Sequence, residues 1–126
     1  MLSLKNISIL IVEDDPATVI LLKEILGNIN KDTYDVVDGQ SAIDFCKTND
    51  VDLVLMDIAL PILDGIEAVK QIKLLKPKLP IIAETVYATP EEVDDLKKAG
   101  FDAYILKPYT GEEMLKLIEE VLVTRN

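Results

Sequence analysis

Short apolar runs alternate along the chain with longer segments whose apolar residues recur three or four positions apart. A short run that is apolar almost throughout is typical of a buried strand, and the wider spacing is typical of an amphipathic helix. The pattern therefore predicts a helix after each strand. The expected strands are Ile7–Val12, Tyr34–Val37, Val51–Met56, Leu79–Ala83 and Ala103–Leu106.

Several local signals mark where these helices begin and end. Asp15-Pro16 is typical of an N-cap followed by the first helical residue. Segments 89–92 and 110–113 both follow the capping-box pattern, with threonine first and glutamate three positions later. Gly100 is expected to end the fourth helix. Five strand–helix units predict an α/β fold of three layers, in which helices cover both faces of a parallel sheet.

Length and composition fit one globular domain over residues 1–126. Apolar residues make up 49% of the chain and charged residues 29%, which is the balance of a folded domain. No repeat, low-complexity segment or linker divides the sequence, and the chain stops soon after its last helical pattern. We therefore expect a single domain without an attached effector domain.

Charge and residue usage exclude several functions. Twenty-three acidic and 13 basic residues give a net charge of −10, which opposes direct nucleic-acid binding. The absence of histidine excludes Ser-His-Asp catalysis and HExxH zinc sites, and Cys46 has no second cysteine to pair with. No apolar run approaches the ~20 residues that span a bilayer, and no secretory signal is evident. We therefore expect no membrane insertion and a cytoplasmic location.

Charged and hydroxyl side chains follow the ends of four predicted strands. Glu13 and Asp14 follow the first strand, Asp57 the third, Thr85 the fourth and Lys107 the fifth. Functional groups of open α/β sheets gather at the carboxyl ends of the strands, so these side chains are expected to converge. Carboxylates about 5 Å apart repel by roughly 3 kcal/mol per pair, so they require a cation. Oxygen ligands favour Mg²⁺, and the lysine and hydroxyl suit phosphoryl chemistry.

Four motifs, taken in order, resemble the receiver domain of response regulators in two-component signalling. They are Ile11–Asp15, Met56–Pro61 with Asp64-Gly65, Glu84-Thr85, and Tyr104–Pro108. Each motif is weak alone, but their order and strand placement are specific, and the resemblance covers nearly the whole chain. It implies a flavodoxin-like (βα)5 fold with strand order 2-1-3-4-5 and a cis Lys107–Pro108 peptide bond.

The resemblance implies a phosphoacceptor and a Mg²⁺ site. Asp57 matches the phosphorylated aspartate and also a metal ligand. Asp14 is expected to bind Mg²⁺ directly, Glu13 through a water molecule and Ala59 through its backbone carbonyl. The implied phosphoryl donor is a phosphohistidine on a sensor histidine kinase or a phosphotransfer protein. The implied chemistry is Mg²⁺-dependent self-phosphorylation and autodephosphorylation, so the chain is not expected to be an enzyme in any wider sense.

The resemblance also implies a conformational switch. Lys107 is expected to bind the phosphoryl group, Thr85 to supply the switch hydroxyl and Tyr104 the switch aromatic ring. Phosphorylation of Asp57 is then expected to change the surface formed by the fourth helix, the fifth strand and the fifth helix. That surface would bind a downstream protein target. A phosphorylation-dependent homodimer is a further expected partner.

An alternative function is a degenerate receiver that binds proteins independently of phosphorylation. A phosphatase of the haloacid dehalogenase type is disfavoured because Ala59 stands where its second aspartate would be. Two positions depart from the receiver pattern. Val86 replaces a small residue and is expected to narrow the access of small donors to Asp57. Glu84 replaces an apolar residue and is expected to point away from Thr85 and to miss the site.

Overall fold

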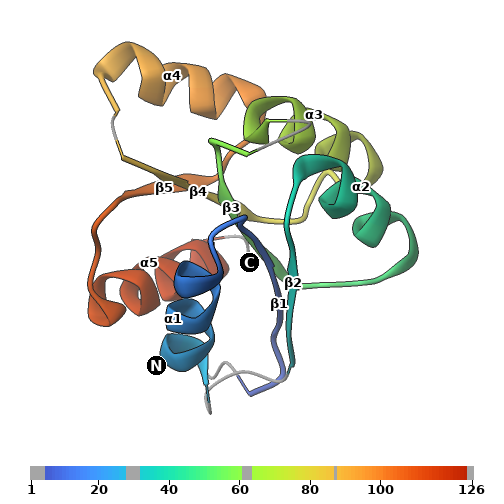
Figure 1. Ribbon diagram of the computed structural model, residues 1–126. Coiled ribbons are helices and arrows are strands. Elements are labelled where there is room, and N and C mark those ends of the chain that lie inside the picture. Colours follow the sequence, from blue (N-terminus) through green and yellow to red (C-terminus); the bar gives the residue numbers. More distant parts are fainter. Residues whose placement is uncertain (1–4, 28–31, 61–63, 87, 125–126) are drawn as a thin grey trace.

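The computed structural model describes residues 5–27, 32–60, 64–86 and 88–124. Strands and helices alternate strictly over these residues (Figure 1). The strands are β1 (Ser8–Val12), β2 (Asp32–Val36), β3 (Leu53–Asp57), β4 (Ile81–Thr85) and β5 (Ala103–Leu106). The helices are α1 (Pro16–Leu26), α2 (Gly39–Thr48), α3 (Gly65–Leu75), α4 (Pro90–Ala99) and α5 (Gly111–Thr124).

The five strands form one parallel sheet in the order β2-β1-β3-β4-β5. This order confirms the flavodoxin-like (βα)5 prediction. Strand β3 lies at the centre, and all five of its residues are buried because helices cover the sheet on both sides. Every strand therefore ends at the same edge of the sheet, where the candidate site residues were expected.

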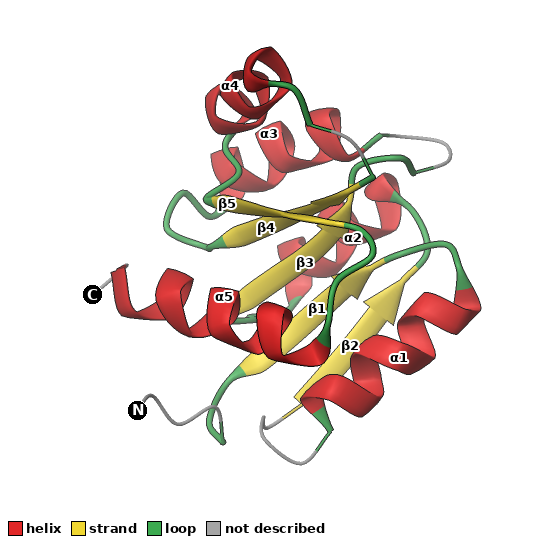
Figure 2. Cartoon of the chain, turned by 90° about the vertical axis from the view of Figure 1, so that its left-hand side faces the viewer, coloured by secondary structure: helices red, strands yellow, loops and turns green. Residues whose placement is uncertain are grey.

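The helices divide between the two faces of the sheet (Figure 2). Each face has its own apolar core. Helices α1 and α5 contribute Leu22 and Ile118 to the core that contains Ile11 and Leu55. Helices α2, α3 and α4 cover the other face, where Val12 and Met56 point. Successive residues of one strand thus alternate between the two cores, and this alternation also sets which face each site residue reaches.

The helix starts follow the signals in the sequence. Asp15 caps α1 through its side chain, and Pro16 is the first helical residue. The capping boxes at 89–92 and 110–113 are both formed. Gly100 ends α4 with a φ of 123°, a conformation that favours glycine. In the part of the chain that the structure describes, no helix has both the length and the apolar character to cross a bilayer.

The strand boundaries differ from the predicted ones by one or two residues at most ends. Val51 and Leu79 are buried but lie ahead of the paired segments of β3 and β4. Strand β2 begins earlier than expected, at Asp32, and Val37 beyond it is exposed. Apolar composition reports burial, whereas strand assignment depends on backbone pairing, so the two need not coincide.

Candidate functional site

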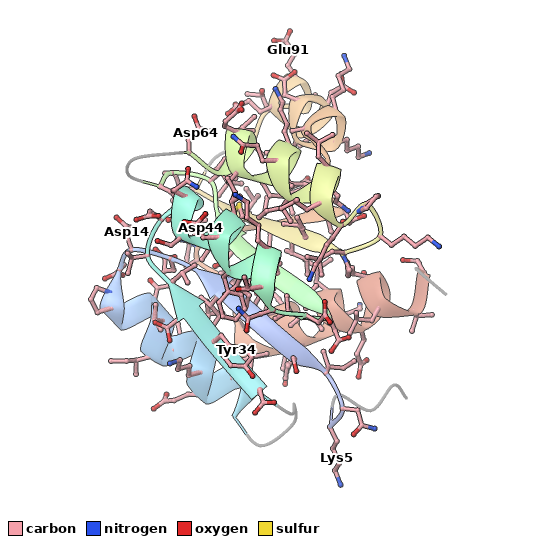
Figure 3. All side chains as sticks on the ribbon, turned by 90° about the vertical axis from the view of Figure 1, so that its right-hand side faces the viewer. Lys5, Asp14, Tyr34, Asp44, Asp64 and Glu91 are labelled. Carbon is pink, nitrogen blue, oxygen red and sulfur yellow. The ribbon has the colours of Figure 1, made fainter. Side chains whose placement is uncertain are left out.

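Four strand ends bring the predicted site residues to one edge of the sheet. Glu13 directly follows β1, Asp57 is the last residue of β3, Thr85 ends β4 and Lys107 directly follows β5. Figure 3 shows the labelled Asp14 side chain at this end of the molecule, whereas Lys5 lies at the opposite end, before β1. The parallel register thus places groups that are far apart in sequence beside one another, as predicted.

Three carboxylates form the centre of this arrangement. Oxygen atoms of Glu13, Asp14 and Asp57 all lie within 4.8 Å of one another. Glu13 is only 2% exposed and Asp57 9%, whereas Asp14 is open to solvent. Two nearly buried acids beside a third fit a hard divalent cation, which would offset their mutual repulsion and accept oxygen ligands. The residues present therefore fit a Mg²⁺ ion.

Lys107 lies against two of these carboxylates. Its Nζ atom donates a hydrogen bond to Glu13 Oε1 at 3.1 Å and lies 3.6 Å from Asp57 Oδ2. Burial lowers the pKa of Lys107, but the hydrogen bond to Glu13 and the surrounding carboxylates outweigh it, so the net shift is upward. The ammonium group is thus held in its charged form beside Asp57.

The carboxyl group of Glu13 is strongly perturbed by its surroundings. Burial raises its pKa to about 7, because desolvation and the charge of Asp57 outweigh the stabilising hydrogen bonds from Lys107 and from the backbone of Asp15. With such a high pKa, the ionised form of the Glu13 carboxyl group is unfavourable unless further positive charge lies nearby. A bound cation would favour its ionised form.

The loop after β3 surrounds the Asp57 side chain. The backbone N–H of Ala59 donates to Asp57 Oδ1 at 3.0 Å, which holds the carboxylate against this loop, and Ala59 is an exposed residue. The N–H of Gly65 in turn donates to the carbonyl of Ile58 at 3.1 Å, joining the start of α3 to this loop. Pro61 lies outside the described residues. The backbone of Ala59 therefore lies next to Asp57, and the use of its carbonyl as a metal ligand stays a prediction.

The two predicted switch residues differ in exposure. Thr85 is buried, and its carbonyl accepts a hydrogen bond from the N–H of Lys107 at 2.8 Å. Tyr104 on β5 is 37% exposed and borders an open hollow that includes Leu106. The ring of Tyr104 therefore lies partly at the surface in this structure. The predicted cis peptide bond between Lys107 and Pro108 is present.

A cavity of about 290 Å³ opens beside Lys107. It is lined by Thr18, Leu21, Val86, Lys107, Pro108 and Tyr109. Val86 is 78% exposed there, so its methyl groups stand at the solvent side of the site. A donor molecule that enters this cavity to reach Lys107 would contact Val86.

Glu84 is the residue whose placement differs from the sequence-based prediction. As expected, the side chains of Glu84 and Thr85 point to opposite faces of the sheet. Glu84, however, pairs in register with Asp57, so it lies on the same face of the sheet as the candidate phosphoacceptor. The expectation that Glu84 misses the site was wrong because it compared Glu84 with Thr85 and not with Asp57. The Tyr109 hydroxyl donates to Glu84 Oε1 at 2.6 Å, a contact that the sequence analysis did not anticipate.

Burial dominates the electrostatics of this pair. It raises the pKa of Glu84, and the hydrogen bond from Tyr109 only partly offsets that effect. Burial and the nearby Glu84 carboxyl also raise the pKa of Tyr109, so its hydroxyl stays protonated and remains the donor. The one available signal in the sequence was a tyrosine two positions after Lys107, together with an acid in an otherwise apolar strand.

Known proteins resemble the chain over almost its full length. The family model for the response regulator receiver domain matches residues 9–119. The chemotaxis protein CheY of Halobacterium salinarum is 37% identical over 114 residues, which cover 90% of this chain and 95% of that protein. A CheY-like receiver domain protein from Methanospirillum hungatei has a similar solved structure, with a TM-score of 0.89 and 31% identity over 95% of this chain and 96% of that one.

A further solved structure contains a metal ion. It is the receiver domain of a sensor histidine kinase from Pseudomonas aeruginosa PAO1, with a magnesium ion coordinated in its active site cleft. Its TM-score is 0.82 at 29% identity, and the match covers 91% of this chain and 96% of that chain. The chain described here belongs to the response regulator receiver domain family of two-component systems.

Proposed function

We propose that the chain is a phosphorylation-dependent signalling switch in which Asp57 accepts a phosphoryl group in the presence of Mg²⁺. The observation that carries the proposal is the position of Lys107 Nζ, 3.1 Å from Glu13 and 3.6 Å from Asp57, beside three clustered carboxylates. A nucleophilic carboxylate that lies next to an ammonium group and belongs to an acidic metal site suits phosphoryl transfer.

The residues divide the chemistry as follows. Asp14 and Asp57 would hold Mg²⁺ directly, Glu13 through water and Ala59 through its carbonyl. Mg²⁺ when bound supplies positive charge to the phosphoryl oxygens. A carboxylate oxygen of Asp57 attacks phosphorus, a P–O bond forms, the P–N bond of a donor phosphohistidine breaks, and its electron pair returns to the imidazole. Lys107 neutralises charge on the oxygens of the transferred phosphoryl group, and the Thr85 hydroxyl donates a hydrogen bond to one of them.

The switch would start from the added charge on Asp57. Phosphorylation takes one negative charge to nearly two and adds acceptor oxygens, which favours a shift of Thr85 toward the phosphoryl group. Tyr104 would then turn into the space that Thr85 leaves, changing the surface of α4, β5 and α5. A change from 1:99 to 99:1 needs about 5.5 kcal/mol, which a few charge-assisted hydrogen bonds of roughly 1.5–3 kcal/mol can provide.

The proposed partners follow from this chemistry. The donor is a sensor histidine kinase or a phosphotransfer protein, and the recipient of the signal is a downstream protein that binds the α4, β5 and α5 surface. We place the whole switch in one receiver domain over residues 1–126 that acts in the cytoplasm. Similar proteins include a chemotaxis protein and the receiver domain of a sensor histidine kinase. Their signalling roles support the proposal that this chain is a signalling switch.

Intact mass spectrometry after incubation with acetyl phosphate and Mg²⁺ tests the proposal. We expect the wild type to gain one phosphoryl group and Asp57→Asn to gain none. Asp50→Asn is a matched control, because Asp50 is exposed and precedes β3 at the opposite end of the same strand from Asp57. It should be phosphorylated like the wild type. No mass gain in the wild type would support the degenerate receiver instead.

A further inference from the structure

The hydrogen bond between Tyr109 and Glu84 joins two parts of the site. Tyr109 lies in the connection between β5 and α5, and Glu84 is the fourth residue of β4. Their side chains meet at 2.6 Å, although 25 positions separate them in sequence. The bond therefore closes the β5–α5 connection against the strand that also carries Thr85.

Glu84 is buried at a position where a carboxyl group is energetically unfavourable. Its exposed fraction is 0%, and it shares its face of the sheet with Ile82 and Ile105, which belong to an apolar core. Among the described residues, Glu84 Oε2 has no hydrogen-bond partner, so the bond from Tyr109 is the side-chain hydrogen bond that holds this carboxyl. A buried polar atom without a hydrogen-bond partner lowers the free energy of unfolding, whereas an apolar side chain at the same position would not.

Lys107 lies between two anchors on consecutive residues of β4. Its own N–H donates to the carbonyl of Thr85 at 2.8 Å, and two residues later Tyr109 is bound to Glu84. The Lys107 side chain leaves the backbone between these anchors and reaches Glu13 and Asp57. Without the Tyr109–Glu84 bond, the backbone bond of Lys107 to Thr85 would be the remaining hydrogen bond described here between this short segment and β4.

We infer that Glu84 and Tyr109 are a positioning pair, which holds the β5–α5 connection so that the Lys107 ammonium stays directed at Asp57. This inference rests on the proposed function of Lys107 in phosphoryl transfer. If the pair were merely structural, replacing both residues by apolar ones of similar size would leave phosphoryl transfer unchanged. If it positions Lys107, the same replacement keeps the fold and slows the transfer.

The experiment compares Tyr109→Phe, Glu84→Leu and the double variant Glu84→Leu/Tyr109→Phe with the wild type. Initial phosphorylation rates are measured by intact mass at increasing acetyl phosphate and saturating Mg²⁺. We expect the double variant to unfold at or above the wild-type temperature, because it removes a buried carboxyl. Its saturating rate should fall roughly tenfold, while the half-saturating donor concentration stays within about a factor of two.

A Lys107→Ala background shows whether the effect passes through Lys107, and Glu84→Gln and Tyr34→Phe serve as controls. In a Lys107→Ala background, Tyr109→Phe should cause no additional loss, because the group that it positions is absent. Glu84→Gln retains an acceptor for the Tyr109 hydroxyl and should recover most of the rate lost in Glu84→Leu. Tyr34→Phe removes a tyrosine hydroxyl on β2, where the ring packs on Phe45, and should match the wild type.

A wild-type saturating rate in the double variant, or an equal effect of Tyr109→Phe with and without Lys107, would overturn the inference. The NMR signals of the Lys107 side chain provide a readout that needs no phosphorylation. They should shift in Tyr109→Phe and in the double variant, and remain unchanged in Tyr34→Phe. If the wild type takes no phosphoryl group, the proposed function fails, whereas unshifted Lys107 signals would refute the positioning pair.

Discussion

Lys107 faces more negative charge than it can neutralise. Lys107 pairs with Glu13 and Asp57, and Asp14 lies beside both of these acids. One ammonium group therefore leaves two of the three negative charges uncompensated when all three acids are ionised. Burial raises the pKa of Glu13 to about 7, and the charge of Asp57 adds to that rise. A divalent cation would balance the charges of the site, and the cation and Lys107 together would offset the additional charge of a phosphoryl group.

Val86 is expected to slow small phosphoryl donors. It lines the cavity beside Lys107 and is 78% exposed, so a donor that enters through this cavity would meet it. Shortening the side chain in Val86→Ala should raise the rate of phosphorylation by acetyl phosphate roughly two- to threefold, a change of less than about 1 kcal/mol in the barrier. The measurement is the initial rate at low donor concentration, followed by intact mass.

Val123→Ala serves as the control for this substitution. Val123 is also exposed, but it lies near the end of α5 and does not line the cavity beside Lys107. Its replacement should leave the rate as in the wild type. An equal or slower rate in Val86→Ala would show that the valine methyl groups do not obstruct the donor.

Single residues could be placed from the sequence wherever their position depended on strand ends alone. Asp57 and Lys107 directly follow the apolar part of their strands, and this was enough to bring them together. Glu84 required more, because its surroundings depend on the register between β3, β4 and β5 and on a tyrosine 25 residues away. Alternation along one strand says which face a side chain points to, but not which other residues share that face.

At the scale of elements, the junction between β3 and α3 determines the position of the loop that holds the Asp57 side chain. Gly65 begins α3 so close to the end of β3 that a Cβ atom there would lie 2.7 Å from Ile58 Cα and 3.0 Å from the Asp57 carbonyl oxygen. Both neighbours are backbone atoms, which cannot move without displacing the loop. The Asp57 carboxylate and the N–H of Ala59 belong to that same loop.

Gly65→Ala is therefore expected to weaken both the fold and the metal site. We expect a loss of about 1–3 kcal/mol in the free energy of unfolding, because the added methyl group overpacks a rigid junction. Mg²⁺ affinity should fall as well, since the loop carrying Asp57 and Ala59 must shift. Chemical denaturation measures the first effect, and isothermal titration calorimetry measures the second.

Gly111→Ala is the matched control at the start of another helix. A Cβ atom at Gly111 would meet Ile25 Cγ1 at 3.4 Å, an ordinary contact distance. Stability and Mg²⁺ affinity should therefore remain close to the wild-type values. Wild-type stability and affinity in Gly65→Ala would contradict the proposed role of the close approach.

The order and type of the elements followed from the sequence more readily than their limits. Capping signals such as Thr89 with Glu92 act within one turn, so they could be recognised locally and were found in place. The start of β2 at Asp32 could not, because it depends on pairing with Ser8 of β1. Strand limits are a property of two segments, whereas helix starts are largely a property of one.

At the scale of the whole molecule, the net charge of −10 favours a site that binds a cation. The two apolar cores stabilise the sheet from both sides, and the excess negative charge acts against them through repulsion. At the carboxyl edge, nearly buried acids lie close together, and salt cannot screen them well. A divalent ion bound there should therefore stabilise the entire domain and not only the loops that hold it.

Mg²⁺ at ten times its dissociation constant should add about 1.4 kcal/mol to the free energy of unfolding and raise the melting temperature by roughly 5 °C. Thermal unfolding followed by circular dichroism, with KCl at equal ionic strength as reference, measures this increment. Asp14→Asn should lose it, because Asp14 belongs to the carboxylate cluster, whereas Asp50→Asn makes the same change in charge and should keep it. An equal increment in KCl, or in Asp14→Asn, would mean that general screening and not a bound ion stabilises the protein.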